Sequence, residues 1–367
     1  MKKSILFSGY YGFDNSGDDA ILEAISTEIK KTRPQLNIHV LSYLPEKTKE
    51  VYGVEALHRF HFKEVFKGLK ETDLFISGGG SLLQDITSSR SLWYYLGLMI
   101  LAKLLRKKVY VYANGIGPID GKFNRFLTKT VLNHVDFITL RDSNSKDFIR
   151  SLGVKHNRVK VTADPVYTLE PSSEERILDI FKNEKIPDKM YIGFALREWM
   201  ESPDLKDKIV EGINLLLEQR KEDILMLPLH YPKDLHFAES IREEVKEKNR
   251  IYILKNNYTV KDLMACFSKL EVVVAMRLHA LIYAVVEEVP IVGLSYDPKV
   301  QGIIEELHLY PGEDVRNFEP KNLVEKILYT LDRKTSCKAH LKYEKKALKE
   351  AALENIKIID TLLEEKE

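Results

Sequence analysis

The chain has 367 residues, of which 30% are charged and 44% are hydrophobic, and its formal net charge is +1. At about 100–200 residues per domain, this length predicts two domains that each bury a core. The near-neutral charge argues against a nucleic-acid-binding protein, so any anionic ligand must be met by a local group of cations. The two cysteines, Cys266 and Cys337, exclude a disulfide framework and fit a reducing, cytoplasmic compartment.

We expect neither a signal peptide nor a membrane span. The apolar run at residues 4–8 is too short for the core of a signal peptide and predicts a strand. The most apolar stretch, residues 92–105, is shorter than the ~20 residues that a bilayer span requires. We expect a helix buried against a sheet there. The alternative is a helix whose apolar face and basic end, Arg106-Lys107-Lys108, rest on a membrane surface.

In the first half of the chain, short apolar runs alternate with helical patterns, which is typical of a parallel sheet covered on both faces. The predicted strands are residues 4–8, 37–41, 74–77, 109–113, 137–140 and 159–162. The main predicted helices are residues 18–32, 92–105 and 144–152. Proline and small polar residues then break the pattern, so the first domain is expected to end near residue 171.

The second half repeats this rhythm. The predicted strands are residues 191–195, 224–229, 251–253, 272–275 and 291–294, and the helices include residues 204–219, 237–248 and about 340–365. We therefore predict an α/β protein with two doubly wound, Rossmann-like domains that face a cleft, residues 1–170 and 171–335. Residues 336–367 are predicted to form an amphipathic helix that packs back on the N-terminal domain.

The first motif is the glycine-containing loop after the opening strand, from Gly9 to Ala20. Its spacing matches neither a dinucleotide fingerprint nor a P-loop, and a capped turn is an alternative explanation of its glycines. Tyr11 and Phe13 offer aromatic rings that suit the apolar face of a sugar, and Asp14 and Asn15 offer polar groups. We expect these four residues to line a sugar-binding site.

The second motif follows the third predicted strand and begins with Gly78, Gly79 and Gly80. Consecutive glycines allow a sharp turn or the close approach of a ligand to the backbone. Ser81, Gln84 and Asp85 follow, and they are candidates for hydroxyl recognition. A tight turn without a ligand is the alternative.

Further candidates are cationic residues at the carboxyl ends of predicted strands, where parallel sheets bind ligands. Arg141 follows one strand of the first domain, although a surface pair with Asp142 would also explain it. In the second domain, Arg277 and His279 stand where a strand runs into an apolar helix, a position that suits an anion. His279 can transfer a proton near neutral pH. Lys299 follows the last predicted strand and is another candidate cation.

Metal chemistry is not indicated. The ten histidines include no His-x-x-x-His pair, and there is no Cys-x-x-Cys pair. We therefore predict no metal site and no resident cofactor.

Taken together, these motifs resemble the polysaccharide pyruvyltransferase family, in particular its bacterial cell-surface-anchoring type. The resemblance rests on the Gly9–Ala20 loop, on the segment from Gly78 to Asp85, and on Arg141-Asp142. It continues through the three segments Asp164-Pro165, Arg277-Leu278-His279-Ala280 and Ser295-Tyr296-Asp297-Pro298-Lys299.

The resemblance implies a fold like that of B-type glycosyltransferases and the transfer of pyruvate from phosphoenolpyruvate to a sugar as a ketal. The implied acceptor is N-acetylmannosamine of a lipid-linked precursor of a secondary cell-wall polymer, bridged across its 4- and 6-hydroxyls. The finished polymer would hold S-layer proteins. Arg141, Arg277 and Lys299 would bind phosphoenolpyruvate, and His279 would move a proton.

Two other functions compete with this one. A nucleotide-sugar glycosyltransferase on the same fold would need an acidic residue to hold a ribose, for which Glu287 and Glu288 are candidates. A non-catalytic carbohydrate-binding module would need none of the four cationic and proton-transferring residues. A membrane-surface location is compatible with a lipid-linked acceptor.

Overall fold

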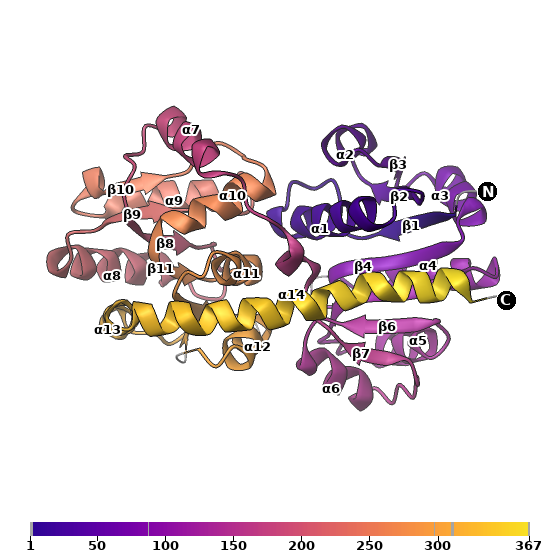
Figure 1. Ribbon diagram of the computed structural model, residues 1–367. Helices are drawn as coiled ribbons and strands as arrows, with labels where there is room; N and C mark the ends of the chain where they lie inside the picture. The colour runs from indigo at the N-terminus through magenta and orange to yellow at the C-terminus, as the bar shows by residue number, and fades with distance from the viewer. Residues whose placement is uncertain (1–2, 87, 297, 310–311, 366–367) are drawn as a thin grey trace. The chain divides into compact units, whose positions relative to one another are not determined.

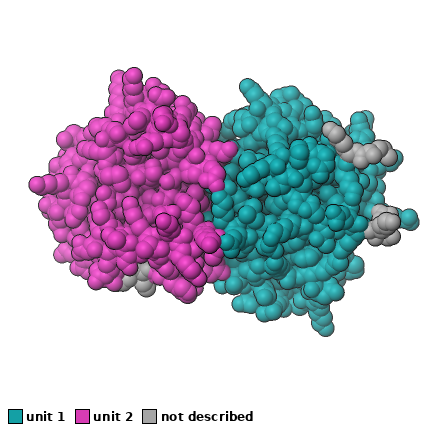
Figure 2. Space-filling view, in the orientation of Figure 1, with its two compact units in different colours: residues 1–169, 348–367 teal, residues 170–347 magenta. Residues whose placement is uncertain are grey.

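The computed structural model describes residues 3–86, 88–296, 298–309 and 312–365. The chain divides into two compact units (Figure 2). Unit 1 comprises residues 1–169 with 348–367, and unit 2 comprises residues 170–347. No helix in the described part of the chain is both long enough and apolar enough to span a membrane.

Unit 1 is built on a seven-stranded parallel sheet with the order β3-β2-β1-β4-β5-β6-β7 (Figure 1). Its strands are β1 (Ser4–Ser8), β2 (Asn37–Ser42), β3 (Glu55–His58), β4 (Leu74–Leu83), β5 (Lys108–Ile116), β6 (Phe137–Leu140) and β7 (Val159–Val161). The strand order reverses between β1 and β4, and the carboxyl ends of strands at such a point form the usual ligand site of a doubly wound sheet.

Helices cover both faces of this sheet, as the alternating sequence pattern predicts. They are α1 (Ser16–Thr32), α2 (Pro45–Tyr52), α3 (Phe62–Glu71), α4 (Ser89–Leu104), α5 (Lys122–Leu132) and α6 (Ser143–Ser151), followed by the short η1 (Pro165–Thr168). Apolar side chains of α3, α4, α5 and α6 share one core with β4, β5 and β6. These four helices therefore form one layer.

Unit 2 repeats the design with a sheet of the order β10-β9-β8-β11-β12-β13, which reverses between β8 and β11. The strands are β8 (Tyr191–Ala195), β9 (Asp223–Met226), β10 (Ile251–Ile253), β11 (Leu270–Ala275), β12 (Ile291–Ser295) and β13 (Glu313–Asp314). The helices are α7 (Glu174–Glu184), α8 (Leu205–Gln219), α9 (Lys233–Glu244), α10 (Val260–Cys266), α11 (Leu278–Val286), α12 (Pro298–Glu306) and α13 (Pro320–Asp332), with the short η2 (Lys248–Arg250) and η3 (Phe267–Lys269).

The last helix, α14 (Lys334–Glu364), begins in unit 2 and ends in unit 1. Its final part belongs to the N-terminal unit, where Asn355 is fully buried. Asn355 Oδ1 accepts a hydrogen bond from the Thr162 hydroxyl at 2.9 Å, and its amide donates to the Ala163 carbonyl at 3.2 Å. A single buried asparagine thus ties the end of the chain to the region after β7.

The predicted α/β class with two Rossmann-like domains is confirmed, but β4 and β5 extend well beyond the predicted residues 74–77 and 109–113. The glycines Gly78 to Gly80 lie within β4, where Gly78 pairs with Tyr112 and Gly80 with Asn114 of β5. Only β3 and β13 lack a predicted counterpart among the strands of the described residues. Both are short edge strands with few apolar residues.

Packing explains why glycine is needed in β4. Gly79 has a φ of +44°, and a methyl group added to it would lie 2.2 Å from Cγ2 of Ile21 on α1. Gly79 thus adopts a left-handed conformation that other residues rarely adopt, at a point where β4 packs closely against α1. Both facts explain why this position needs glycine.

We expect the substitution Gly79→Ala to lower the free energy of unfolding by at least about 2 kcal/mol, because it adds both backbone strain and overpacking. Gly97→Ala is the matched control, since Gly97 lies within α4 and has nothing within 4 Å of an added methyl group. This control should leave stability unchanged or raise it by about 0.5–1 kcal/mol. Urea unfolding measures both, and equal effects of the two substitutions would contradict the role given to Gly79.

Candidate functional site

In unit 2, two arginines stand beyond the strands where the sheet order reverses. Arg197 follows β8, and Arg277 follows the adjacent β11 and precedes the first residue of α11. The first backbone N–H groups of a helix have no partner within the helix, so this end of α11 favours an anion. Two guanidinium groups and a helix N-terminus therefore occur together at the expected ligand site of the sheet.

Arg277 is held in place by a buried carboxylate. Its Nε donates to Oδ2 of Asp234 at 2.6 Å, and its Nη2 donates to Oδ1 of the same side chain. Asp234 is 2% exposed and also accepts hydrogen bonds from the backbone N–H groups of Leu229 and His230 at 3.2 and 3.0 Å. This bidentate pair fixes the plane of the guanidinium and leaves its Nη1 outside the contact.

Arg197 is held by aromatic rings instead. Its guanidinium lies 5.4 Å from the ring centroid of Trp199 and 5.0 Å from that of Tyr296, and its Nη1 donates to the Tyr296 hydroxyl at 3.1 Å. Within the described residues it forms no ion pair, and its Nε is buried without a hydrogen-bond partner. Arg197 is thus a positive charge that no described carboxylate offsets.

Two histidines lie beside these arginines. His279 occupies the first turn of α11, with its ring 6.4 Å from that of Tyr283. His230 follows β9, and burial together with the neighbouring Arg277 charge lowers its pKa below the usual value of 6.5. His230 is therefore neutral at pH 7 and can accept or donate a hydrogen bond without adding charge.

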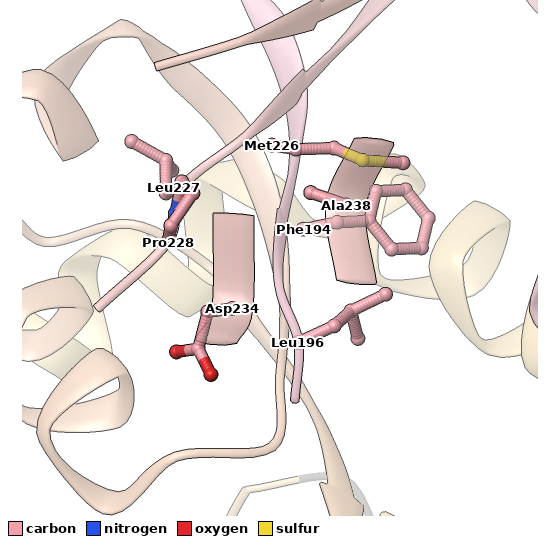
Figure 3. A pocket seen from close by; sticks show the side chains of 7 residues that line it. All are labelled: Phe194, Leu196, Met226, Leu227, Pro228, Asp234 and Ala238. Carbon is pink, nitrogen blue, oxygen red and sulfur yellow. The ribbon is translucent and has the colours of Figure 1, made fainter. Parts of the chain in front are cut away.

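Figure 3 shows a hollow between β8, β9 and α9 whose lining is apolar except for the carboxylate of Asp234. The other lining residues are Phe194, Leu196, Met226, Leu227, Pro228 and Ala238. It has room for no more than about one water molecule, so it is not a substrate site. Its effect is to keep Asp234 in apolar surroundings, where an ionised carboxylate depends on its pairing with Arg277.

Lys299 cannot be placed in the same way. Its backbone lies in the first turn of α12, but its side chain and the whole of Asp297 lie outside the described residues. The role predicted for Lys299 stays a prediction.

In unit 1, the loop after β1 and strand β4 meet at the point where the sheet order reverses. Asn15 caps α1 by accepting from the Gly17 N–H at 3.2 Å, and its amide donates to Oδ2 of Asp18 at 2.6 Å. A methyl group added at Gly80 would lie 3.0 Å from Oδ1 of Asp18. The glycine-rich strand thus brings its backbone against a carboxylate in the first turn of α1.

That carboxylate has an unusual proton affinity. Burial and the neighbouring Asp19 raise the pKa of Asp18 from 3.8 to about 7, although the positive charge of Arg141 opposes the rise. Burial and Asp14 likewise raise the pKa of Asp19 to about 7. The charge of Asp19 is thus one cause of the raised pKa of Asp18. Values in this range suit proton transfer near neutral pH.

Arg141 is 8% exposed and its contacts are within the protein. Its Nη1 donates to Oδ2 of Asp164 at 3.0 Å, and its Nη2 donates to the Ser81 hydroxyl at 2.7 Å. A methyl group added at Gly115 would lie 2.9 Å from the guanidinium, so β5 passes directly beside it. Asp142, expected as an alternative partner, caps α6 and lies 3.7 Å from Arg141. These contacts make Arg141 a link between β4, β6 and η1.

Asp85 likewise forms hydrogen bonds with other groups of the protein. Its carboxylate accepts from the backbone N–H groups of Asp120 and Gly121 at 2.9 and 3.0 Å, and from the Asn124 amide at 2.7 Å. These bonds lower the pKa of Asp85. The residue braces the segment after β5, and Gln84 lies half-buried before it. Hydroxyl recognition by either residue stays a prediction.

The aromatic residues of the first loop differ from expectation in one respect. Tyr11 is 1% exposed and its hydroxyl donates to the Gly78 carbonyl at 3.3 Å, so it holds the loop and has no ring face for a sugar. Phe13 stacks between Tyr10 and Tyr43, with centroid separations of 4.1 and 4.8 Å. Tyr10 and Tyr43 are 40% and 45% exposed and provide the accessible surface of this stack. Asp14 pairs with Lys47 of α2.

A buried arginine that the sequence analysis overlooked organises these rings. Arg59 is 5% exposed, and its guanidinium lies 4.7 to 5.6 Å from the centroids of four rings, Phe13, Phe60, Tyr94 and Tyr95. Its Nη1 also donates to the Gly9 carbonyl at 2.8 Å. Arg59 and the rings around it, including Tyr10 and Tyr43, are called the aromatic cluster below. Nothing in the local sequence marks Arg59, because all of its ring partners except Phe60 come from two distant segments, the first loop and α4.

Within the described residues, no group of three or more histidine, cysteine, aspartate or glutamate side chains could hold a metal ion.

The raised pKa of Asp18 predicts a pH-dependent stability. A carboxyl group with a folded pKa above its unfolded value stabilises the fold at pH values below about 4, and this contribution is lost as the pH rises through about 7. Asp18→Asn cannot ionise, so its stability relative to wild type should increase by at least about 1 kcal/mol between pH 5 and pH 8. Urea unfolding at both values measures this. The exposed Asp147→Asn is the control, and equal pH dependence in both variants would contradict the assignment.

Comparisons with known proteins identify the family and the fold. A family model described as polysaccharide pyruvyl transferase matches residues 15–298. The amylovoran biosynthesis protein AmsJ of Erwinia amylovora is 20% identical over 385 residues, which cover 89% of this chain and 92% of AmsJ.

Solved structures share the fold at low identity. A glycosyltransferase from Rickettsia africae has a TM-score of 0.68 at 13% identity, with all of both chains covered. MnaA of S. aureus, solved with UDP, has a TM-score of 0.65 at 14% identity, with 100% of this chain and 99% of that chain covered. These likenesses establish a B-type glycosyltransferase fold with two Rossmann-like domains. Because the family model spans most of the sequence, the chain belongs to the polysaccharide pyruvyl transferase family and is a polysaccharide pyruvyltransferase.

Proposed function

We propose that this enzyme transfers pyruvate from phosphoenolpyruvate to two hydroxyl groups of one sugar, forming a cyclic ketal and releasing phosphate. The observation that carries the proposal is the pair of strand-end guanidiniums, Arg197 and Arg277, with His279 in the adjoining first turn of α11. Phosphoenolpyruvate carries a phosphate and a carboxylate, and both groups suit guanidinium donors.

On the donor side, Arg277 offers its Nη1, and Arg197 offers the charge that no described carboxylate offsets. Lys299 would add a third cation if its side chain reaches the same anion. The neutral His230 beside Arg277 can hydrogen-bond a phosphate oxygen without changing the charge of the site.

The reaction removes a proton from each of two sugar hydroxyls and adds one to C3 of phosphoenolpyruvate. In the first step, one hydroxyl gives its proton to a base as its oxygen bonds to C2, and a proton is added to C3, which turns the methylene group into a methyl group. In the second step, the bond between C2 and the phosphate oxygen breaks as a second sugar oxygen bonds to C2, and its proton leaves with phosphate. We assign the protonation of C3 to His279, because imidazole exchanges protons near neutral pH.

On the acceptor side, we assign the deprotonation of the attacking hydroxyl to Asp18. A carboxyl group whose pKa is about 7 is both partly ionised and sufficiently basic at neutral pH. Asn15 orients it, and the backbone of Gly78 to Gly80, Ser81 and the aromatic cluster supply the surrounding surface. Arg141 would act indirectly, by positioning Ser81 and by its charge near Asp18.

For the acceptor, we propose N-acetylmannosamine of a lipid-linked secondary cell-wall polymer precursor, bridged across its 4- and 6-hydroxyls. The support is the resemblance of the motif set to the cell-surface-anchoring type. The product would anchor S-layer proteins. The enzyme would then work in the cytoplasm at the membrane surface, where phosphoenolpyruvate and a lipid-linked sugar are both accessible.

The rival assignment is a nucleotide-sugar glycosyltransferase, since neighbours of the same fold include a protein solved with UDP. Its candidate ribose ligands do not fit. Glu287 and Glu288 lie at the carboxyl end of α11, roughly 12 Å along the helix from His279. Burial raises the pKa of Glu287 to about 7, and Glu288 pairs with Lys345. Family membership removes the third possibility, a module without catalysis.

The test is mass spectrometry of a synthetic lipid-linked disaccharide that ends in N-acetylmannosamine, after incubation with phosphoenolpyruvate. We expect the mass of one added pyruvate ketal and an equal amount of free phosphate. His279→Ala should reduce kcat by at least about 100-fold, because general acid–base catalysis contributes that much.

His236→Ala is the matched control, since His236 is exposed on α9 of the same unit, and its turnover should equal that of wild type. Release of UDP from UDP-sugars without ketal formation would replace the proposal with its rival. Wild-type turnover by His279→Ala would remove the role of His279 alone.

A further inference from the structure

Helix α4 is apolar on both of its sides. Its inner side contributes six buried residues, Leu92, Tyr95, Leu96, Leu98, Met99 and Ala102. Its outer side exposes Trp93 by 47%, Ile100 by 38% and Leu104 by 75%. A surface helix normally carries polar residues on its outer side, and a helix that is apolar all round is normally covered on all sides. We therefore expect the exposed apolar side of α4 to contact another molecule.

The neighbouring helices of the same layer extend this surface. On α3, Phe62 and Phe66 are 69% and 38% exposed, and their rings stack with a centroid separation of 6.1 Å. On α5, Phe123 and Phe126 are 62% and 65% exposed. The ring of Phe123 lies edge-on to Trp93 of α4, at 6.3 Å between centroids. Seven large apolar side chains on three adjacent helices form what we call the α3–α5 face.

The charge of the α3–α5 face is strongly positive although the whole chain is nearly neutral. The three helices contain eight lysines and arginines but only two acidic residues, Glu64 and Glu71 on α3. Six of the eight are exposed, namely Lys63, Lys67, Lys70, Arg90, Lys122 and Lys129. Aromatic and aliphatic side chains interspersed with cations are typical of surfaces that enter the headgroup region of a membrane.

The α3–α5 face is also continuous with the acceptor side of unit 1. The ring of Phe60, directly before α3, lies 5.8 Å from that of Tyr94 on α4, and both belong to the aromatic cluster around Arg59. The Tyr94 hydroxyl donates to the Arg59 carbonyl at 3.0 Å. Through Arg59 and Phe13 the cluster reaches the loop that holds Asn15 and Asp18.

We propose that the α3–α5 face docks on the surface of an anionic lipid bilayer. Charge complementarity favours anionic headgroups, because the face carries an excess of cations, and two copies of it would repel each other. The exposed rings and aliphatic side chains would bury themselves at the boundary between headgroups and acyl chains. Membrane docking would give the enzyme of the proposed function access to a lipid-linked acceptor. The docking proposal is argued from the composition of the α3–α5 face, so docking and ketal formation can fail separately.

The test is co-sedimentation of the full-length protein with vesicles made of equal parts phosphatidylglycerol and phosphatidylcholine. We expect wild type to bind these vesicles, to bind pure phosphatidylcholine vesicles more weakly, and to lose affinity as salt increases. Phe62→Ser/Leu104→Ser/Phe126→Ser should lower the partition coefficient at least about tenfold, because three buried apolar side chains are lost.

Leu178→Ser/Met200→Ser/Tyr343→Ser is the matched control, since it removes three exposed apolar side chains outside the α3–α5 face. It should bind as wild type does. Lys63→Glu/Lys67→Glu/Lys122→Glu keeps every apolar side chain and should abolish the preference for phosphatidylglycerol. This second variant tests the proposal even if the serine variant does not fold.

Equal loss of binding in the serine variant and its matched control would overturn the proposal, as would wild type that binds neither kind of vesicle. A wild-type dimer that the serine variant dissociates, without vesicle binding, would make the face a subunit interface and overturn it too. Ketal formation on a water-soluble disaccharide separates the two proposals. If the ketal forms but the protein does not bind vesicles, the docking proposal fails and the proposed function stands. If the protein binds vesicles but no ketal forms, only the proposed function fails.

Discussion

The ion pair between Arg277 and Asp234 is the constraint on which the arrangement of strand ends in unit 2 depends. Asp234 comes from α9, beyond β9, and Arg277 comes from the end of β11, while β8 lies between these two strands. One buried carboxylate thus joins the carboxyl ends of the strands on either side of the point where the sheet order reverses. Its other hydrogen bonds, from the N–H groups of Leu229 and His230, fix the turn before α9. Asp234 is 2% exposed, and burying its carboxylate without a partner would be energetically costly. The folded unit therefore requires the ion pair with Arg277.

Unit 1 also contains a buried arginine–aspartate pair at its strand ends, but there the arginine is enclosed by protein. Arg141 follows β6, Asp164 follows β7, and the buried pair reaches Ser81 on β4. The guanidinium of Arg141 is surrounded by protein, whereas Arg277 keeps a nitrogen outside its pair and Arg197 has no described counter-ion. Local pairing of this kind is compatible with an anion site in a chain of net charge +1, because some cations, such as Arg141, are paired with carboxylates, whereas Arg197 has no ion-pair partner among the described residues. It also explains why the surplus of lysine and arginine on the α3–α5 face stands out.

The sequence places Arg141, Arg277 and His279 at strand ends, because strand position depends on local apolar runs, and the structure confirms that position. The same reasoning applied to β8 would have found Arg197. Asp234 lies 43 positions from Arg277, and no local pattern connects them. The sequence predicts a turn or a ligand-lining segment at the glycines of β4, because sequence alone does not reveal pairing with β5 or the contact between Gly79 and Ile21. The pKa of Asp18 depends on burial, and Arg59 depends on rings from distant segments, so both became visible only in the folded chain.

In the proposed reaction, Asp234 acts through Arg277 to bind the anionic donor. A double-mutant cycle in kcat/KM for phosphoenolpyruvate, with Asp234→Asn, Arg277→Lys and the double variant, tests it most directly. We expect each single substitution to lower kcat/KM at least about tenfold and the double variant to be no worse than Arg277→Lys, because the loss of Arg277 leaves Asp234 nothing to orient. Independent effects that multiply in the double variant would show that Asp234 does not work through Arg277 and would contradict the claim.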